Sequence, residues 1–263
     1  MSIELSSPTP NSHRPMFVFV HGILGFDPFP FCSHSIQYFR GVQQTLEREG
    51  FAVDFPAVPS LRPIHERASV LAQRLAHLEN ERIYLIGHSM GGLDCRYVVH
   101  HSDTKRRIQA VATVATPHRG TPLAQWFLQR NRVAQWLTQP WMKPAIQELT
   151  PEACAIFNSQ VPLSPDVRFL SYAASRPVEE MLLWFRPWTR MLTETAGPND
   201  SHVPVSSAMW GDFQEIVRAD HFEVAGWSLG MANRAMQRPF GSIPFYRRIV
   251  QQLSTLTRRP RTS

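Results

Sequence analysis

Short apolar runs alternate with longer amphipathic stretches along the chain. The runs are four to seven residues long and predict buried strands at 17–20, 51–55, 83–86, 108–114, 167–172 and 213–217. Apolar residues recur at helical spacing between the first of these runs, at 35–49, 65–79 and 91–100. Strands that alternate with helices favour right-handed crossover connections. The pattern therefore predicts an α/β fold with a mainly parallel central sheet flanked by helices.

Two stretches, residues 120–165 and 176–197, interrupt this alternation after the fourth and fifth predicted strands. They contain five of the seven tryptophans of the chain, which predicts a Trp-rich helical cap. Such rings can simply pack a cap onto the sheet, or they can form the apolar underside of a lid over an apolar substrate. We favour a cap that does both. The candidate substrate or lid residues are Trp126, Phe127, Trp184 and Trp188.

The composition fits one large domain preceded by a short tail. Residues 1–15 are polar and contain three prolines, so we predict that this N-terminal segment is disordered. Hydrophobic residues make up 43% of the whole sequence, which is typical of a globular protein, and no internal repeat is visible. A single α/β domain over residues 16–263 fits this length better than two small domains.

The positive charge of the chain is concentrated at its C-terminal end. The formal net charge is +6, and residues 224–263 hold seven arginines and no acidic residue, so the first 223 residues sum to 6 − 7 = −1. A basic tail can lie on anionic lipid or on nucleic acid. No aromatic residues lie among the last three arginines, so we expect no nucleic-acid partner and favour a solvated last helix.

Nothing in the sequence predicts export or a membrane span. The start of the chain has no apolar signal core, and no stretch reaches the length of about 18 apolar residues that a spanning helix needs. Three cysteines, Cys32, Cys95 and Cys154, cannot all pair within one chain, which indicates a reducing compartment. We therefore expect a cytoplasmic protein.

A Gly-x-Ser-x-Gly motif, Gly87-His88-Ser89-Met90-Gly91, lies directly after the third predicted strand and before a predicted helix. In this context the serine occupies a sharp strained turn that exposes its hydroxyl. Side chains two residues away on either side would collide, which explains glycine at both positions. The N-terminus of the following helix adds a positive dipole near any developing negative charge. Ser89 is therefore the candidate nucleophile.

A serine nucleophile needs a base and an orienting acid, which follow it in the order Asp, then His, in this kind of strand–turn–helix arrangement. His221 is the last histidine of the chain and follows the last predicted strand, so it is the candidate base. Asp200 lies in a turn-rich loop after the fifth strand and is the chosen acid. Asp212 and Asp220 are the competing acids. Asp212 lies at the start of a predicted strand, on the wrong side for the active site. Asp220 is the neighbour of His221 in the sequence, and neighbouring side chains tend to point apart.

The tetrahedral intermediate of acyl transfer needs two backbone N–H donors. One is expected from Met90, directly after the nucleophile. The other is expected from Ile23 in the loop after the first strand, where Gly22 allows a tight turn. We interpret His21 as a residue that braces this loop.

Four motifs, found in one order between about residues 16 and 228, carry a resemblance to a known family. They are His21-Gly22-Ile23-Leu24-Gly25-Phe26-Asp27, Gly87-His88-Ser89-Met90-Gly91-Gly92-Leu93-Asp94, Thr116-Pro117-His118-Arg119-Gly120-Thr121 and Asn199-Asp200-Ser201-His202-Val203-Pro204-Val205. In these motifs the chain resembles the bacterial triacylglycerol lipases of the α/β-hydrolase fold. The resemblance implies hydrolysis of carboxylic esters, a mobile lid, Ser89, Asp200 and His221 as a triad, and Ile23 and Met90 as oxyanion donors.

The chain also departs from the family. Secreted members that it resembles carry a signal peptide, and several hold a disulfide and a calcium ion near the catalytic histidine. Glu223 could be a remnant of a calcium ligand, but hard cations need several converging oxygens and Trp227 offers none. We therefore expect no metal and no cofactor.

The sequence thus predicts a serine hydrolase that cleaves carboxylic esters with an apolar acyl chain, a lipase or an esterase. The expected partner is a lipid or a small apolar ester, with transient contact to a lipid interface. Two alternatives stay open: an acyltransferase that uses the same acyl-enzyme, and a non-catalytic lipid-binding member of the fold.

Overall fold

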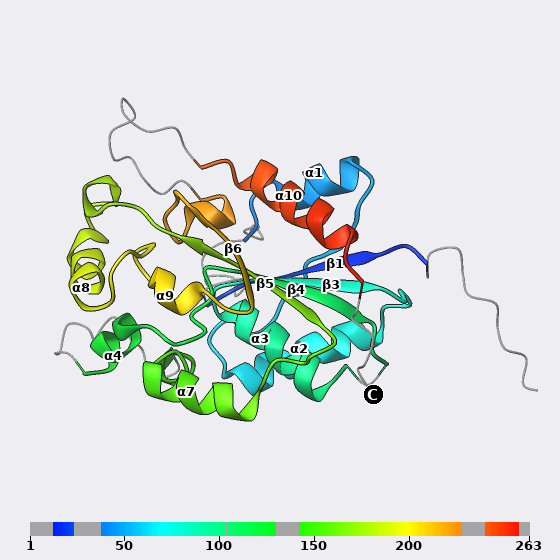
Figure 1. Cartoon of the computed structure of the whole chain (residues 1–263), viewed down its shortest axis with the longest axis horizontal. Helices are drawn as coiled ribbons and strands as arrows, with labels where there is room; N and C mark the ends of the chain where they lie inside the picture. The colour runs from blue at the N-terminus through cyan, green and yellow to red at the C-terminus, as the bar shows by residue number, and fades with distance from the viewer. Residues whose placement is uncertain (1–12, 24–37, 104, 130–141, 228–239, 258–263) are drawn as a thin grey trace, which may run out of the picture.

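A computed structural model describes residues 13–23, 38–103, 105–129, 142–227 and 240–257. Its centre is a six-stranded sheet in which all neighbouring strands are parallel, in the order β2-β1-β3-β4-β5-β6 (Figure 1). The strands are β1 (Met16–Val20), β2 (Ala52–Asp54), β3 (Ile83–His88), β4 (Ile108–Val114), β5 (Arg168–Ala174) and β6 (Asp212–Val217). All six predicted strands are present at the predicted places, so the α/β prediction is confirmed.

The direction of strand order reverses between β1 and β3. The chain passes from β1 outward to β2, returns to β3 beside β1, and then proceeds through β4 to β6. Val20 at the end of β1 is in register with Gly87 near the end of β3. The segments that follow these two strands therefore begin side by side, at the kind of switch point where open α/β sheets bind ligands.

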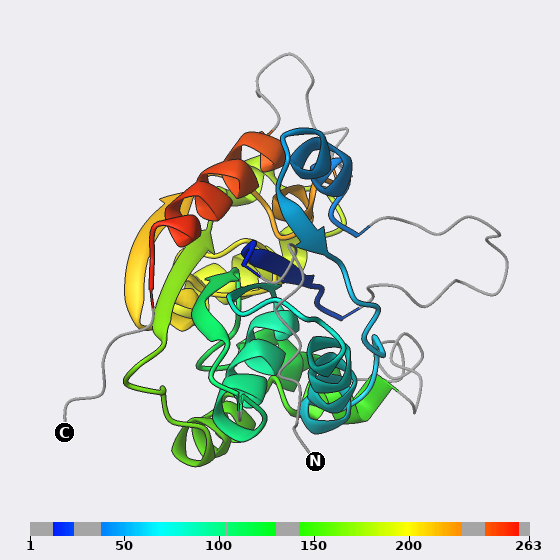
Figure 2. The same ribbon diagram turned by 90° about the vertical axis from the view of Figure 1, so that its right-hand side faces the viewer.

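Helices cover both faces of the sheet. Helices α1 (Val42–Arg48) and α10 (Ser242–Ser254) lie together on one face, and α2 (Ile64–Ala76) and α3 (Met90–His101) pack on the other (Figures 1 and 2). Successive side chains of a strand point to opposite faces. Accordingly Phe17 and Phe19 of β1 belong to the core under α1 and α10, whereas its valines belong to the core under α2 and α3.

The first predicted helix is shorter than its apolar pattern. The sequence predicted a helix over 35–49, but residues 35–37 lie outside the described residues and α1 begins only at Val42. Gly41 directly before it has a φ of 74°, in the left-handed region that favours glycine and interrupts an α-helix. The other two helices match their predicted ranges to within three residues at each end.

Both predicted cap segments contain helices. The first holds α4 (Pro122–Gln129), α6 (Lys143–Gln147) and α7 (Pro151–Gln160); the second holds the short 3-10 helix η2 (Val178–Glu180) and α8 (Arg186–Ala196). Helix α4 contacts α8, so the two segments meet. Trp136 and Trp141 lie outside the described residues. The short helix α9 (Val205–Ala208) lies between the second segment and β6. The 3-10 helix η3 (Glu223–Ala225) follows β6.

The ends of the chain are partly described. Residues 1–12 of the segment predicted to be disordered lie outside the described residues, but Arg14 is attached, because its carbonyl accepts a hydrogen bond of 2.9 Å from Asn80. At the other end, Arg247 pairs with Glu49 and Arg248 pairs with Glu215. Part of the basic charge of the tail is thus compensated on the protein surface, and Arg258, Arg259 and Arg261 lie outside the described residues.

The structure also bears on the pairing of the cysteines and on the search for a membrane span. Cys95 and Cys154 are free and buried, and Cys32 lies outside the described residues. Within the part of the chain that the structure describes, no helix combines the length and the apolar character needed to cross a membrane.

Candidate active site

Ser89 occupies a strained turn between β3 and α3. Its backbone has φ 55° and ψ −131°, a combination that non-glycine residues rarely adopt and that costs on the order of 1–3 kcal/mol. The N–H of Ser89 donates a 2.9 Å hydrogen bond to the carbonyl of Val114 at the end of β4. The turn is therefore held by the neighbouring strand, and Ser89 stands at the carboxyl edge of the sheet.

Glycines around the turn allow α3 to approach the strands closely. A Cβ atom at Gly87 would lie 2.5 Å from the Cα of Gly92, and one at Gly91 would lie 2.3 Å from the carbonyl oxygen of Val20. Both distances are far below normal van der Waals contact. Any side chain at these positions would push the helix away from β1 and β3 and would displace Ser89 with it.

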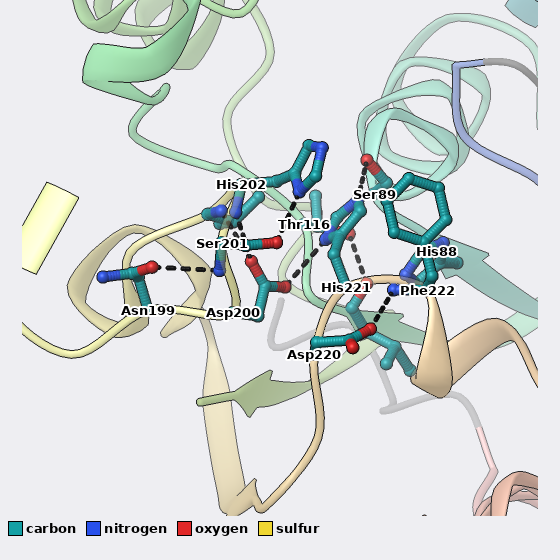
Figure 3. A network of polar contacts seen from close by, with 12 residues as sticks. His88, Ser89, Thr116, Asn199, Asp200, Ser201, His202, Asp220, His221 and Phe222 are labelled. Atoms are coloured by element: carbon teal, nitrogen blue, oxygen red, sulfur yellow. Dashed lines mark hydrogen bonds and ion pairs between the residues drawn. The ribbon is translucent and has the colours of Figure 1, made fainter. Parts of the chain in front are cut away.

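The structure brings Ser89, His221 and Asp200 together from three separate segments (Figure 3). The Oγ atom of Ser89 lies 3.1 Å from Nε2 of His221, and the Nδ1–H of His221 donates a 2.7 Å hydrogen bond to Oδ2 of Asp200. All three residues are buried. This geometry lets a proton pass from the hydroxyl to the imidazole while the carboxylate fixes the ring and its tautomer.

Asp200 is itself held by further hydrogen bonds. Its Oδ1 atom accepts from the backbone N–H groups of His202, at 2.9 Å, and Val203, at 2.7 Å. Its backbone carbonyl accepts a 2.9 Å hydrogen bond from the N–H of His221. Asp200 thus binds His221 through both the ring and the backbone, so neither residue can shift alone.

The two competing carboxylates take other roles. Asp212 begins β6 and is exposed to solvent. Asp220 turns away from the ring of His221, and its Oδ1 atom accepts 2.8 Å hydrogen bonds from the N–H groups of Phe222 and Glu223. Burial, followed by the charge of Glu223, raises the pKa of Asp220 to about 6. Asp220 therefore caps the turn that carries His221.

Two further imidazole rings flank His221. The ring centres of His88 and His202 each lie 4.7 Å from that of His221, and the His202 ring is stacked on it. Burial lowers the pKa of His202 to about 3 and that of His88 well below its usual 6.5. Both flanking rings are consequently neutral at neutral pH, and neither adds positive charge beside His221.

The loop after β1 lies directly over Ser89. A Cβ atom at Gly22 would stand only 2.7 Å from the Cβ of Ser89, so this contact requires glycine. Arg67 of α2 donates hydrogen bonds to the carbonyls of His21, at 2.6 Å, and Gly22, at 3.4 Å. It also pairs with Asp94 of α3 at 2.7 Å, and the side chains of this pair are completely buried.

The hydrogen bonds from Arg67 fix the carbonyls of His21 and Gly22 in the loop after β1. His21 braces the same loop, since its ring accepts a 3.2 Å hydrogen bond from the N–H of Val58, and burial lowers the pKa of His21 to about 4. Met90 begins α3, where N–H groups have no partner within the helix. Ile23 and Met90 thus stand on two segments that both contact Ser89.

Five rings form an aromatic wall beside His221: Phe127, Phe185, Trp188, His202 and Phe222. Phe185 stacks on Trp188 at 5.2 Å and on Phe222 at 5.3 Å, while Trp188 lies 5.9 Å from Phe127 of α4. His202 contacts Phe185, Trp188 and Phe222 at 5.2–6.1 Å between ring centres. The wall therefore joins both cap segments to the loops of His221 and Asp200.

The structure divides the four aromatic candidates of the sequence into two groups. Phe127 and Trp188 belong to the aromatic wall, and Trp126 packs against Phe127 at 5.2 Å. Trp184 lies outside the wall with 80% of its surface exposed. Phe185 lies among the aromatic residues of the second predicted cap stretch but was not chosen as a candidate, and His202 and Phe222 were not considered for the wall; only their positions next to other selected residues could have pointed to them.

The described residues contain no group of three or more His, Cys, Asp or Glu side chains that could hold a metal ion. Glu223, considered from the sequence as a calcium-ligand remnant, forms an ion pair with Arg176 at 2.6 Å. His118 is buried as well, stacked on Trp210 at 5.3 Å and 3.0 Å from the hydroxyl of Thr113. These contacts hold the segment that follows β4.

Comparison with known proteins places this arrangement in a family. The model of the α/β hydrolase fold family matches residues 15–150, a range that contains the loop after β1 and the Ser89 turn. The chain belongs to the α/β hydrolase fold family. This confirms the resemblance that the sequence motifs predicted.

Named relatives of this α/β hydrolase are lipases. Triacylglycerol lipase 2 of Saccharomyces cerevisiae is 31% identical over 205 residues, which cover 73% of this chain and 63% of the yeast protein. The triacylglycerol lipase of Pseudomonas fragi is 33% identical over 118 residues, 43% of this chain and 38% of that protein. The chain therefore spans less than two thirds of the length of either relative.

Solved structures agree on the fold. A metagenomic carboxyl esterase superimposes with a TM-score of 0.74 at 20% identity, over 95% of this chain and 79% of the esterase. The Staphylococcus hyicus lipase gives a TM-score of 0.68 at 17% identity, over 94% of this α/β hydrolase and 98% of the lipase.

The buried histidines predict that acid destabilises this α/β hydrolase. Burial lowers the pKa of four histidines, His21, His88, His118 and His202. In the unfolded chain such rings take up protons as the pH falls through about 6.5, whereas in the folded protein they stay neutral. The unfolded state then binds more protons, so the free energy of unfolding decreases as the pH decreases.

The variant His118→Gln tests this prediction, because it removes one buried ring that lies beside Thr113 and Trp210 rather than in the triad. Urea unfolding between pH 7 and pH 4 should give a wild-type free energy that falls more steeply than that of the variant, by up to about 1.4 kcal/mol per pH unit below 6.5. Asp220, with its raised pKa, acts in the opposite direction, but it is present in both proteins and cancels. Parallel curves would contradict the prediction.

Proposed function

We propose that this protein hydrolyses carboxylic esters with an apolar acyl chain through an acyl-enzyme on Ser89. The observation that carries the proposal is the continuous hydrogen-bonded line from Ser89 through His221 to Asp200, built on a strained turn. Binding alone would not need that strain. The similarity to triacylglycerol lipases supports the same activity.

In the proposed reaction, Oγ of Ser89 attacks the ester carbonyl carbon while Nε2 of His221 takes the hydroxyl proton. Asp200 stabilises the resulting imidazolium through Nδ1. The N–H groups of Ile23 and Met90 donate to the oxyanion. When the intermediate collapses, the C–O bond to the alcohol breaks and His221 gives its proton to the departing oxygen. Water then attacks the carbonyl carbon of the acyl-enzyme while His221 takes its proton, the bond to Oγ of Ser89 breaks, and the acid is released.

The aromatic wall supports an apolar acyl or alcohol group as substrate. It lies next to His221 and is lined by rings from both cap segments, as expected for an apolar pocket with few polar groups. We propose that the two cap segments act as a lid over this wall. No cofactor takes part in the proposed reaction.

Exposed apolar residues on the cap support transient contact with a lipid interface. Leu183 and Trp184 are 70% and 80% exposed, and Arg190 on the following helix is also exposed. An exposed tryptophan followed by an exposed arginine on the next helix is suited to a boundary between water and lipid headgroups. We propose that the protein approaches its lipid substrate with this side of the cap.

Replacement of triad residues tests the mechanism. We expect Ser89→Ala to lower kcat by on the order of 10⁶-fold, as in other triads, and Asp200→Asn to lower it by on the order of 10⁴-fold because the imidazole loses its orientation. Asp212→Asn is the matched control and should keep wild-type kcat. Ester hydrolysis followed by release of p-nitrophenol measures all three, and circular dichroism checks folding. Near-wild-type kcat in Ser89→Ala would reject the proposed nucleophile.

Acyl-chain length tests the substrate class. With p-nitrophenyl esters from acetyl to palmitoyl, we expect kcat/KM to be highest for long chains. Trp188→Ala should lower kcat/KM for long chains about tenfold, the effect of about 1.4 kcal/mol of lost apolar contact, and leave the acetyl ester nearly unchanged. An equal loss at every length would contradict the role of the aromatic wall. Ester formation with added alcohol, without hydrolysis, would identify an acyltransferase instead.

A further inference from the structure

A buried arginine lies beneath the loop that carries His221. Arg176 follows β5, and only 3% of its side chain is exposed. Its Nε and Nη2 atoms donate to the two carboxylate oxygens of Glu223 at 2.6 and 3.0 Å. Its remaining nitrogen, Nη1, donates to Glu180 in η2 at 3.0 Å. The guanidinium therefore joins the start of the second cap segment to the turn after β6.

Glu223 takes part in a reciprocal cap around His221. The Oδ1 atom of Asp220 accepts from the N–H of Glu223 at 2.8 Å, and Oε2 of Glu223 accepts from the N–H of Asp220 at 2.9 Å. This is the arrangement of a capping box, which fixes the first turn of a helix. His221 lies between Asp220 and Glu223 in the sequence, so the position of Glu223 determines the path of the His221 backbone.

Arg176 also contacts the loop of the acid. Its backbone N–H donates a 3.2 Å hydrogen bond to the carbonyl of Asn199, the residue before Asp200. The side-chain amide of Asn199 donates to the carbonyl of Thr189 and the hydroxyl of Thr193 in α8, at 3.3 and 3.1 Å. Its Oδ1 atom accepts from the N–H of Ser201 at 2.9 Å, as Figure 3 shows.

We propose that Arg176 is a positioning residue, which sets the distance between Ser89 and His221 by holding the acid loop and the base loop on one support. This rests on the proposed function for the roles of the triad residues. Without the guanidinium, the carboxylate of Glu223 loses its bidentate partner while its side chain is only 12% exposed. A buried unpaired charge is costly, so Glu223 turns to solvent and releases the N–H of Asp220.

The first test compares kcat and KM for a soluble short-chain ester. We expect Arg176→Met to lower kcat about 10- to 100-fold, the effect of a misplacement of about 1 Å at the reacting atoms, with KM little changed. Arg176→Lys should retain more activity because it keeps the charge but not the fork. Arg218→Gln is the matched control: Arg218 pairs with the outer side of Glu180, is 69% exposed, and its loss should leave kcat unchanged.

A double variant separates positioning from stability. Arg176→Met leaves a charged Glu223 without its partner, so its melting temperature should fall. Adding Glu223→Leu removes that charge and should raise the melting temperature again, because a buried ion pair can be replaced by apolar side chains without loss of stability. The acceptor for the N–H of Asp220 is then absent as well, so kcat should stay low. Recovery of kcat together with the melting temperature would show a purely structural role and would overturn the proposal.

A readout without substrate distinguishes this proposal from the proposed function. The Nδ1 proton between His221 and Asp200 should give a sharp low-field proton resonance in the wild type and in Arg218→Gln, and a broadened or absent one in Arg176→Met. If the wild type cleaves no ester but the resonance responds in this way, the proposed function fails and the positioning role stands. If the wild type cleaves esters while kcat and the resonance are unchanged in Arg176→Met, the positioning role is rejected.

Discussion

The close approach of α3 to the ends of β1 and β3 is the constraint on which the rest of the structure depends. It requires glycine at Gly87 and Gly91, because any Cβ atom there would meet backbone at 2.3–2.5 Å. It also sets the strained φ of 55° at Ser89 and brings the loop after β1 to within contact of that residue. The packing of one helix thus determines where the proposed nucleophile and its oxyanion donors stand.

Asp200 and His221 reach Ser89 from loops, and hydrogen bonds hold these loops in place. Asp200 fixes His221, since it binds both the ring and the backbone N–H of that residue. Arg176 supports both loops, because it contacts each of them as well as η2. The cap is joined to the same loops through Asn199 and the aromatic wall. The cap and the geometry at Ser89 are therefore physically connected.

The sequence predicted those parts of the molecule whose signal is local. All six strands were found, because buried parallel strands are continuous apolar runs, and the strained turn at Ser89 was predicted from a motif tied to one backbone conformation. The start of α1 was missed, since the apolar pattern continues through a left-handed Gly41. Arg176 and His202 were missed because their partners, Glu223 and His221, lie far away in sequence or depend on the folded loop.

The most direct test of the account is covalent labelling by an organophosphate ester, followed by mass spectrometry of the digested protein. A serine that is activated by His221 should displace the leaving group and retain one phosphoryl group. The account predicts a single modification, on the peptide that contains Ser89, and none in Ser89→Ala. Modification of a different residue, or an unmodified wild type, would contradict the claim that the strained turn carries an activated nucleophile.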